Sequence, residues 1–224
     1  MDTLPPAVEA IGLSLRTRGG AVYENITLAV PAGAFAMLVG PTGSGKTALL
    51  LTLAGRMKPT RGLFRSFGED GLRFGSAVRR RTSLALAGGV NDLSDTLSVR
   101  DHVREALALH GERATPVRIT AALSAVGLTC DPARKAGSLS AIDRELLGVA
   151  LAQVYRPRVL IVDDADHDLT PDEQGRLMSA LRVIADSGVT VIAACVDPRL
   201  AASADVTLAV TIDTVKGVDV DEVA

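Results

Sequence analysis

The stretch that decides the fold is Gly40-Pro41-Thr42-Gly43-Ser44-Gly45-Lys46-Thr47, which fits the pattern GxxxxGK(S/T). Directly before it, residues 34–40 (AFAMLVG) form a continuous apolar run with the length of a strand buried on both faces. Directly after it, residues 47–55 (TALLLTLAG) show a helical pattern that Gly55 closes. The sequence therefore predicts a strand, a glycine-rich turn and a helix, in this order.

This spacing suits the binding of phosphate groups. Glycines let backbone N–H groups curl around an anion without clashes from Cβ atoms, and the helix N-terminus adds its positive end. We expect Lys46 to reach the β- and γ-phosphates of a nucleotide and the Thr47 hydroxyl to hold Mg²⁺. A random chain of this length matches the pattern on the order of one time in a hundred. The predicted nucleotide-binding residues are Gly40, Pro41, Thr42, Gly43, Ser44, Gly45, Lys46, Thr47 and Ala48.

A second buried strand supplies an acidic residue for the same site. Residues 159–163 (VLIVD) are apolar up to Asp163, which can hold the water shell of Mg²⁺. Many strands end in Asp, so this signal is weak alone. Together with the glycine-rich turn it predicts a magnesium-bound nucleotide.

The remaining pattern predicts an α/β fold. The first thirty residues alternate as two strands joined by a turn at Gly19-Gly20, and further strands are expected at 63–67, 83–87, 189–195, 206–212 and 215–220. Residues 91–157 change to amphipathic helices, with helix starts at Ser98 and at Thr115-Pro116. Another helix runs from Thr170 to about Asp186. Buried strands that alternate with helices indicate a mostly parallel sheet.

Composition excludes several classes of protein. The chain has 224 residues with 47% hydrophobic residues, which is enough for one well-packed domain. A formal net charge of −2 argues against a general nucleic-acid partner. The two cysteines lie far apart in the sequence and do not form a CxxC metal-binding motif. The first residues do not resemble a signal peptide, and no apolar run approaches the ~18 residues of a membrane span. We therefore expect a cytoplasmic protein that reaches the inner face of a membrane only through a partner.

The chain as a whole resembles the ATP-binding cassette (ABC) ATPases, the nucleotide-binding subunits of ABC transporters. Residues 139–143 (LSAID) stand at the place of the family's LSGGQ signature, and Leu139 lies 24 positions before Asp163, the family's usual interval. Pro157 falls where the family has a proline before this second strand. The resemblance implies one domain over 1–224, with a P-loop α/β core at 1–88 and 158–224, an N-terminal antiparallel β region and an inserted helical lobe at 89–157.

The resemblance also implies partners. In this family two chains form a head-to-tail dimer, and each ATP lies between one chain's phosphate loop and the other chain's signature, here at Ser140. Closure and hydrolysis then drive a membrane permease. The residues leave open the transported substrate, the choice between ATP and GTP, and whether the second ABC-type chain is a copy of this one.

Several catalytic positions depart from the family pattern. The family's catalytic Glu corresponds to Asp164, whose carboxylate is one methylene shorter, and the switch His corresponds to Val196, which has no donor. The glutamine loop falls at Gly88-Gly89, where Asn91 is the nearest amide. The aromatic residue that stacks on adenine corresponds to Thr17 or Arg18; Arg18 could stack by a cation–π contact.

The signature is altered as well. Ala141 and Ile142 replace two glycines that let backbone approach the partner's γ-phosphate, and we expect Ile142 to obstruct that approach. Ser140-x-x-Asp143 is equally well explained as a simple helix N-cap. Among the histidines, His102 and His110 on the helical lobe are expected to be exposed. His167 is expected at the solvated surface, and the alternatives are that it faces the partner chain or replaces the missing switch residue.

The expected function is that of an ABC-type ATPase with low turnover, in which Lys46 and Asp164 carry the chemistry. A non-hydrolysing regulatory or scaffold protein, which signals nucleotide occupancy to a partner, is the alternative. A small P-loop kinase is disfavoured because the interval between signature and second strand is that of the ABC family.

Overall fold

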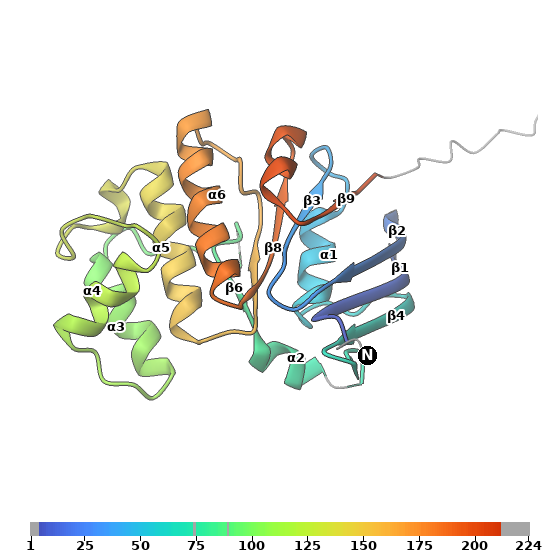
Figure 1. The fold of residues 1–224 in the computed structure, drawn as a ribbon, viewed down its shortest axis with the longest axis horizontal. Coiled ribbons are helices and arrows are strands. Elements are labelled where there is room, and N and C mark those ends of the chain that lie inside the picture. The colour runs from blue at the N-terminus through green and yellow to red at the C-terminus, as the bar shows by residue number, and fades with distance from the viewer. Residues whose placement is uncertain (1–4, 74, 89, 212–224) are drawn as a thin grey trace, which may run out of the picture.

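The computed structural model describes residues 5–73, 75–88 and 90–211. These residues form a five-stranded parallel sheet and a four-stranded antiparallel sheet (Figure 1). The parallel sheet has the order β6(Thr82–Leu84), β7(Val159–Val162), β8(Thr190–Cys195), β3(Phe35–Val39) and β9(Val206–Ala209). The antiparallel sheet has the order β2(Gly20–Val30), β1(Val8–Thr17), β4(Arg61–Ser66) and β5(Glu69–Asp70). The predicted α/β class, with its parallel core and antiparallel N-terminal region, is confirmed.

Burial explains why the two sheets have different sequence patterns. Every residue of β7 and β8 is buried, because helices cover one face of the parallel sheet and α1 with the antiparallel sheet covers the other. Strands β1 and β2 form an antiparallel pair in which Val8 lies opposite Val30. Along both strands, buried residues are interspersed with more exposed ones. The alternation predicted in the first thirty residues therefore reflects a sheet with one solvated face.

The helices lie on both sides of the parallel sheet. Helix α1(Lys46–Leu53) lies between the two sheets and contributes Leu49, Leu50 and Leu53 to their shared core. The opposite face is covered in Figure 1 by α5 and α6, with α3 and α4 farther out. The bounds of the remaining helices are α2(Gly75–Arg81), α3(Val99–Leu109), α4(Pro116–Ser124), α5(Ala141–Val154) and α6(Pro171–Asp186), with 3-10 turns η1(Ala136–Ser138) and η2(Pro198–Ser203).

The predicted helix starts are confirmed by their caps. Ser98 and Thr115 accept hydrogen bonds from the backbone N–H groups of Asp101 and Arg118. Thr170 begins α6 with a full capping box, in which the Glu173 side chain bonds back to the backbone of Thr170. These caps satisfy N–H groups that have no partner within a helix.

The helical segment shares its core with the framework. Buried side chains of α3, α4, α5 and α6 form one hydrophobic cluster with the adjacent face of the parallel sheet. Helix α5 packs so closely here that a Cβ on Gly148 would lie 2.3 Å from Cγ of Leu86. The interior of the helical segment thus continues into that of the α/β framework.

Some expectations are wrong in detail. His102 is only 7% exposed, because α3 faces the preceding loop and its Nε2 lies 3.1 Å from the carbonyl oxygen of Ser94. His110 is exposed as expected. Strand β6 spans Thr82–Leu84 and β9 ends at Ala209, so both end earlier than predicted. Helix α2 and strand β5 were not expected, and the strand predicted at 215–220 lies outside the described residues. Among the described residues, no helix is both long and apolar enough to span a bilayer.

Candidate functional site

The glycine-rich turn joins the carboxyl end of β3 to the first turn of α1, beside the carboxyl end of β8. Gly45 has a φ of 87°, and a Cβ there would lie 2.1 Å from the carbonyl oxygen of Val22. A Cβ on Gly40 would lie 2.2 Å from the carbonyl oxygen of Val210. Both positions therefore require glycine, for conformation and space at one and for space at the other.

Two donors of this turn are available to an anion. Lys46 is only 5% exposed, and its ammonium donates to the carbonyl oxygens of Gly40 and Pro41 at 2.7 and 3.1 Å. Ser44 is 2% exposed, and its Oγ has no hydrogen-bond partner within the described part of the chain. A buried hydroxyl without a partner is costly unless a ligand satisfies it. The N-terminus of helix α1 lies at the same place. Since no side chain caps it, its first backbone N–H groups are also available to an anion.

Thr47 and Asp163 lie together beside the turn. The Asp163 carboxylate is 7% exposed, and the Thr47 hydroxyl lies near enough to influence its ionisation. Burial raises the pKa of the Asp163 carboxyl, and the nearby Thr47 hydroxyl opposes that rise. The described residues contain no group of three or more His, Cys, Asp or Glu side chains that could hold a metal by themselves. One carboxylate and one hydroxyl fit Mg²⁺, which takes its other ligands from phosphate and water.

Asp164, the candidate general base, occupies an unusual backbone conformation. Its φ is 43°, in the left-handed region, and its side chain is exposed. The backbone around it forms a tight turn, since the N–H of His167 donates to the carbonyl oxygen of Asp164 at 2.9 Å. Asp adopts left-handed backbone more readily than Glu does. The shorter carboxylate therefore suits this turn.

The switch position is occupied by the half-exposed Val196, directly after β8. Its backbone N–H donates to Oδ2 of Asp166 at 2.8 Å, and the N–H of Asp197 donates to the same oxygen at 2.7 Å. No motif in the sequence marks Asp166. The one signal for it is that a further carboxylate stands two residues after Asp164.

The loop at 84–91 uses its own amide internally. Asn91 Oδ1 accepts from the N–H of Ala87 at 2.9 Å, and Nδ2 donates to the carbonyl oxygens of Leu84 and Ala85 at 3.2 and 2.8 Å. Asn91 is thus committed to shaping this loop and does not replace the glutamine of the family pattern. Gly89 lies outside the described residues.

The altered signature begins α5. Ser140 is the N-cap and accepts from the N–H of Asp143 at 3.2 Å. Ile142 is 1% exposed, so the expectation that its side chain obstructs the approach to a partner's γ-phosphate is wrong: the side chain belongs to the hydrophobic core beneath the helix. The carboxylate of Asp143 lies 3.6 Å from the guanidinium of Arg176 on α6. A contact between Ser140 and a partner's phosphate remains a prediction.

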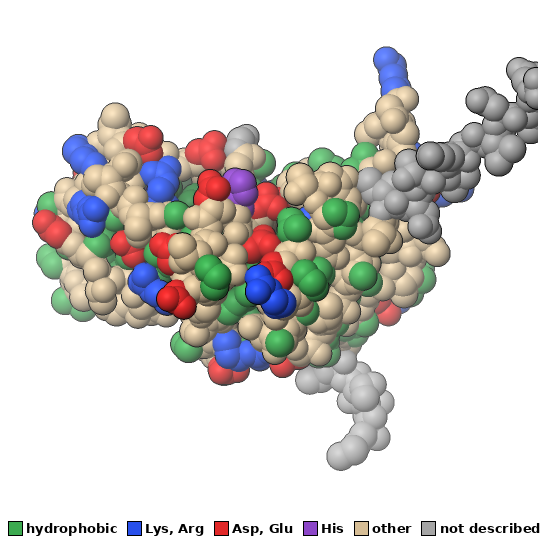
Figure 2. All heavy atoms as spheres, turned by 90° about the horizontal axis from the view of Figure 1, so that it is seen from above, with side chains coloured by type: hydrophobic (Ala, Val, Ile, Leu, Met, Phe, Trp, Pro, Cys, Tyr) green, Lys and Arg blue, Asp and Glu red, His purple; other side chains and the backbone are tan. Residues whose placement is uncertain are grey.

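The structure brings together only part of the predicted set. Lys46, Thr47 and Asp163 lie at one place, with Asp164 next along the chain. Ser140 starts a helix on the opposite side of the parallel sheet from α1 (Figure 1). Figure 2 shows the molecule of Figure 1 from above. On this face, Asp and Glu side chains gather around a histidine. At the expected adenine position, Thr17 and Arg18 are exposed at the end of β1.

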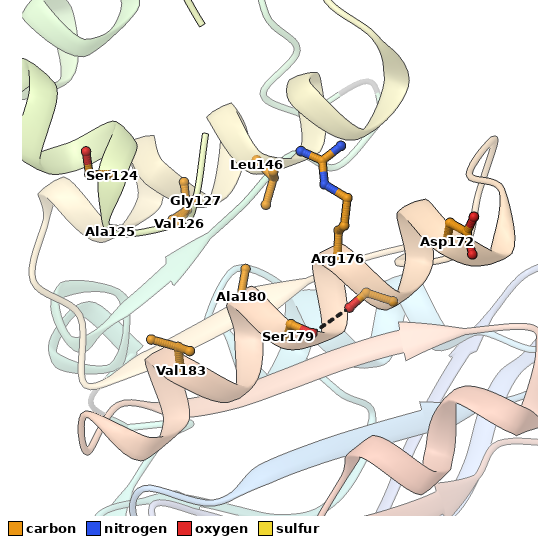
Figure 3. Close-up of a pocket in the computed structure, with 11 residues that line it drawn as sticks. Ser124, Ala125, Val126, Gly127, Leu146, Asp172, Arg176, Ser179, Ala180 and Val183 are labelled. Atoms are coloured by element: carbon orange, nitrogen blue, oxygen red, sulfur yellow. Dashed lines mark hydrogen bonds between the residues drawn. The ribbon is translucent and has the colours of Figure 1, made fainter. Parts of the chain in front are cut away.

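A spacious groove lies away from the glycine-rich turn. It measures about 690 Å³ and is lined by the end of α4, by Leu146 of α5 and by Arg176, Ala180 and Val183 of α6 (Figure 3). None of residues 40–48 lines it. The chemistry of the glycine-rich turn, rather than the size of a cavity, therefore identifies the candidate site.

A comparison with known protein families gives a match that spans the residues of the candidate site. The model of the ABC transporter family matches residues 23–167. A "Probable anion import ATP-binding protein" of Haloferax volcanii is 34% identical over 194 residues, which cover 80% of this chain and 67% of that protein. The "Phosphate import ATP-binding protein PstB 2" of Natronomonas pharaonis is 32% identical over 212 residues, covering 88% and 74%. The chain spans 52% of a methionine import ATP-binding protein of Cutibacterium acnes, at 30% identity.

Solved structures agree in fold. A dimeric ATP-binding cassette in a post-hydrolysis state, bound to ADP and Pi, superposes with a TM-score of 0.78 at 20% identity, covering 91% of this chain and 94% of the other. A protein from Clostridium perfringens, part of the ABC transporter complex cbiONQ, gives a TM-score of 0.79 at 19% identity, covering 92% and 85%. At these identities the likeness concerns the fold.

Proposed function

Because the chain belongs to the ABC transporter family of ATP-binding proteins, we propose that it binds Mg-ATP at residues 40–47 and hydrolyses it slowly. The observation that carries the binding half is the set of buried donors in the turn. Lys46 holds only backbone carbonyls, and Ser44 holds no partner among the described residues. Triphosphate oxygens would satisfy both, with the N-terminus of α1 behind them.

Thr47 and Asp163 are the residues that would hold Mg²⁺. When bound, the ion would supply positive charge that stabilises the negative charge on the transferred phosphoryl group. The hydroxyl of Thr47 and the carboxylate of Asp163 lie near each other, so both oxygens could bind one cation. It would also favour the ionised form of this buried carboxyl, whose pKa burial raises.

The slow step in this proposal is the activation of water. Asp164 stands where the family has Glu, and a misplacement of about 1 Å can lower a rate by roughly 10²-fold. Val196 offers no side-chain donor to a γ-phosphate, and the N–H groups of residues 196 and 197 are held by Asp166. These features favour low turnover rather than loss of binding.

The proposed partners are a second ABC-type chain and a membrane permease. Support for the first comes from the dimeric cassette of the same fold. Support for the second comes from relatives that are named as import proteins for anions and phosphate. In this proposal the protein works at the inner face of the membrane through its permease, which selects the transported substrate.

Titration of the purified chain with ATP, with and without Mg²⁺, tests the binding half. We expect saturable binding that EDTA weakens and that Lys46→Ala lowers at least tenfold. Arg79→Ala serves as the control, because Arg79 is exposed on α2 and bonds to the carbonyl oxygen of Gly55. Equal affinities of the wild type and Lys46→Ala would refute binding at this turn.

A further inference from the structure

We propose that Asp166 is a positioning residue: its carboxylate anchors the segment at Val196 and thereby holds the turn that carries Asp164. For its catalytic consequence this inference rests on the proposed function. Oδ2 of Asp166 accepts two backbone N–H groups, from Val196 at 2.8 Å and from Asp197 at 2.7 Å. One ionised oxygen thus joins segments that are 30 residues apart in sequence, through short charge-assisted hydrogen bonds.

Hydrogen bonds to β8 and to α6 hold the turn that contains Asp164 and Asp166. Toward β8, the N–H of Ala165 donates to the carbonyl oxygen of Ala194 at 2.8 Å. Toward α6, Nε2 of Gln174 donates to the carbonyl oxygens of Leu169 at 3.1 Å and of Asp166 at 3.4 Å. The carboxylate of Asp166 extends the contact with β8 beyond the end of the strand, because residues 196 and 197 follow Cys195.

The anchoring explains how this chain orders a segment whose side chain at 196 cannot make a polar contact. The valine side chain has no hydrogen-bond donor. The carboxylate of Asp166, in the neighbouring turn, instead accepts a hydrogen bond from the backbone N–H of this residue. The left-handed conformation of Asp164 lies in the same turn and persists only if the surroundings determine it. Asp166 would therefore fix the switch segment and the direction of the Asp164 carboxylate together.

Asp166→Ala tests the inference, with Asp168→Asn as the matched control, because Asp168 has a φ of 56° and asparagine tolerates left-handed backbone as aspartate does. Asp168 lies in the same turn, but its side chain is 81% exposed, and Oδ2 lies 3.5 Å from Nε2 of the similarly exposed His167. We expect backbone hydrogen exchange at Val196 and Asp197 to rise about tenfold or more in Asp166→Ala, because two hydrogen bonds to a charged group are lost. Exchange at His167, whose N–H closes the turn at Asp164, should rise as well.

Kinetics separate positioning from a general loss of structure. Asp166→Ala should lower kcat about tenfold while the Kd for Mg-ATP stays within about twofold, and Asp166→Asn, which keeps one acceptor, should recover part of the rate. Asp168→Asn should match the wild type in every measurement. Unchanged exchange at residues 167, 196 and 197 would overturn the inference, and so would an unchanged kcat. If the wild type binds ATP but shows no turnover, the hydrolysis half of the proposed function fails, and the exchange at these three residues still decides the anchoring.

Discussion

At the scale of single residues, the glycine-rich turn depends on the absence of side chains at defined positions. Gly43 and Gly45 both have left-handed backbone, with φ of 81° and 87°. They differ in space, because a Cβ on Gly45 would lie 2.1 Å from the carbonyl oxygen of Val22, whereas a Cβ on Gly43 would have no described atom within 4 Å. A comparison of substitutions at Gly43 and Gly45 therefore distinguishes the cost of conformational strain from the cost of a steric clash.

We predict that Gly45→Ala lowers the free energy of unfolding by more than about 2 kcal/mol and abolishes ATP binding, because strain and a backbone clash act together. Gly43→Ala should lower it by about 1 kcal/mol, from strain alone. Urea denaturation of both variants measures the difference. Equal losses in the two variants would show that the clash with Val22 is relieved by movement of the turn.

A half-buried carboxyl on α5 predicts a dependence of stability on pH. Burial raises the pKa of the Glu145 carboxyl from an ordinary value of 4.5 to about 7, Asp164 adds to the rise, and Arg144 and His167 oppose it. The folded state thus binds this proton more tightly than the unfolded state. The resulting stability is complete below about pH 4.5 and is lost as the pH rises through about 7.

Glu145→Gln should remove this dependence, because glutamine does not ionise. At pH 8 the variant should be more stable than the wild type, by at most about 3 kcal/mol, and at pH 5 the two should differ little. Thermal unfolding of both proteins from pH 5 to pH 8 measures the gap. A gap that does not widen with pH would contradict a raised pKa at Glu145.

At the scale of elements, the helix starts are the best-determined local features. Thr170 and Glu173 form a reciprocal box at α6: the N–H of Thr170 donates to Glu173 Oε2 at 2.9 Å, and the N–H of Glu173 donates to Thr170 Oγ1 at 3.4 Å. Thr115 at α4 makes only one such bond, from the N–H of Arg118 at 3.3 Å. Because α6 follows directly on the turn with Asp164 and Asp166, its start also positions that turn.

We predict that Thr170→Ala lowers the free energy of unfolding by about 1–2 kcal/mol, and that Thr115→Ala lowers it by less than this. Chemical denaturation at equilibrium measures both. A larger loss at Thr115 than at Thr170 would contradict the importance assigned to the capping box.

At the scale of the whole molecule, the sequence predicted what depends on local pattern. The apolar runs at 34–40, 159–163 and 189–195 mark strands covered on both faces, since such strands have no solvated side. Helix α2 escaped prediction because its seven residues bury only Val78 and so show no periodicity. The predicted nucleotide-binding residues follow from one contiguous motif, and the meeting of Thr47 with Asp163 follows from the parallel order of β7, β8 and β3.

Features that arise from long-range packing could not be predicted. The bonds from Val196 and Asp197 to Asp166 join the ends of two neighbouring strands, and no local pattern encodes them. The replacement of a signature glycine by Ile142 predicts an obstruction, whereas the phase of α5 turns this side chain into the core. His102 is buried because a loop eight residues earlier in the chain folds over α3.

The most direct test of the account is phosphate release by the purified chain at saturating Mg-ATP, with Lys46→Ala as the blank and ATP binding measured in the same sample. The account predicts release above the blank but far below about 10 s⁻¹, the median turnover of enzymes, with binding at full occupancy. Turnover above about 10 s⁻¹ would contradict the roles assigned to Asp164 and Val196. Full binding without release would contradict slow hydrolysis and favour the nucleotide-dependent regulatory or scaffold protein.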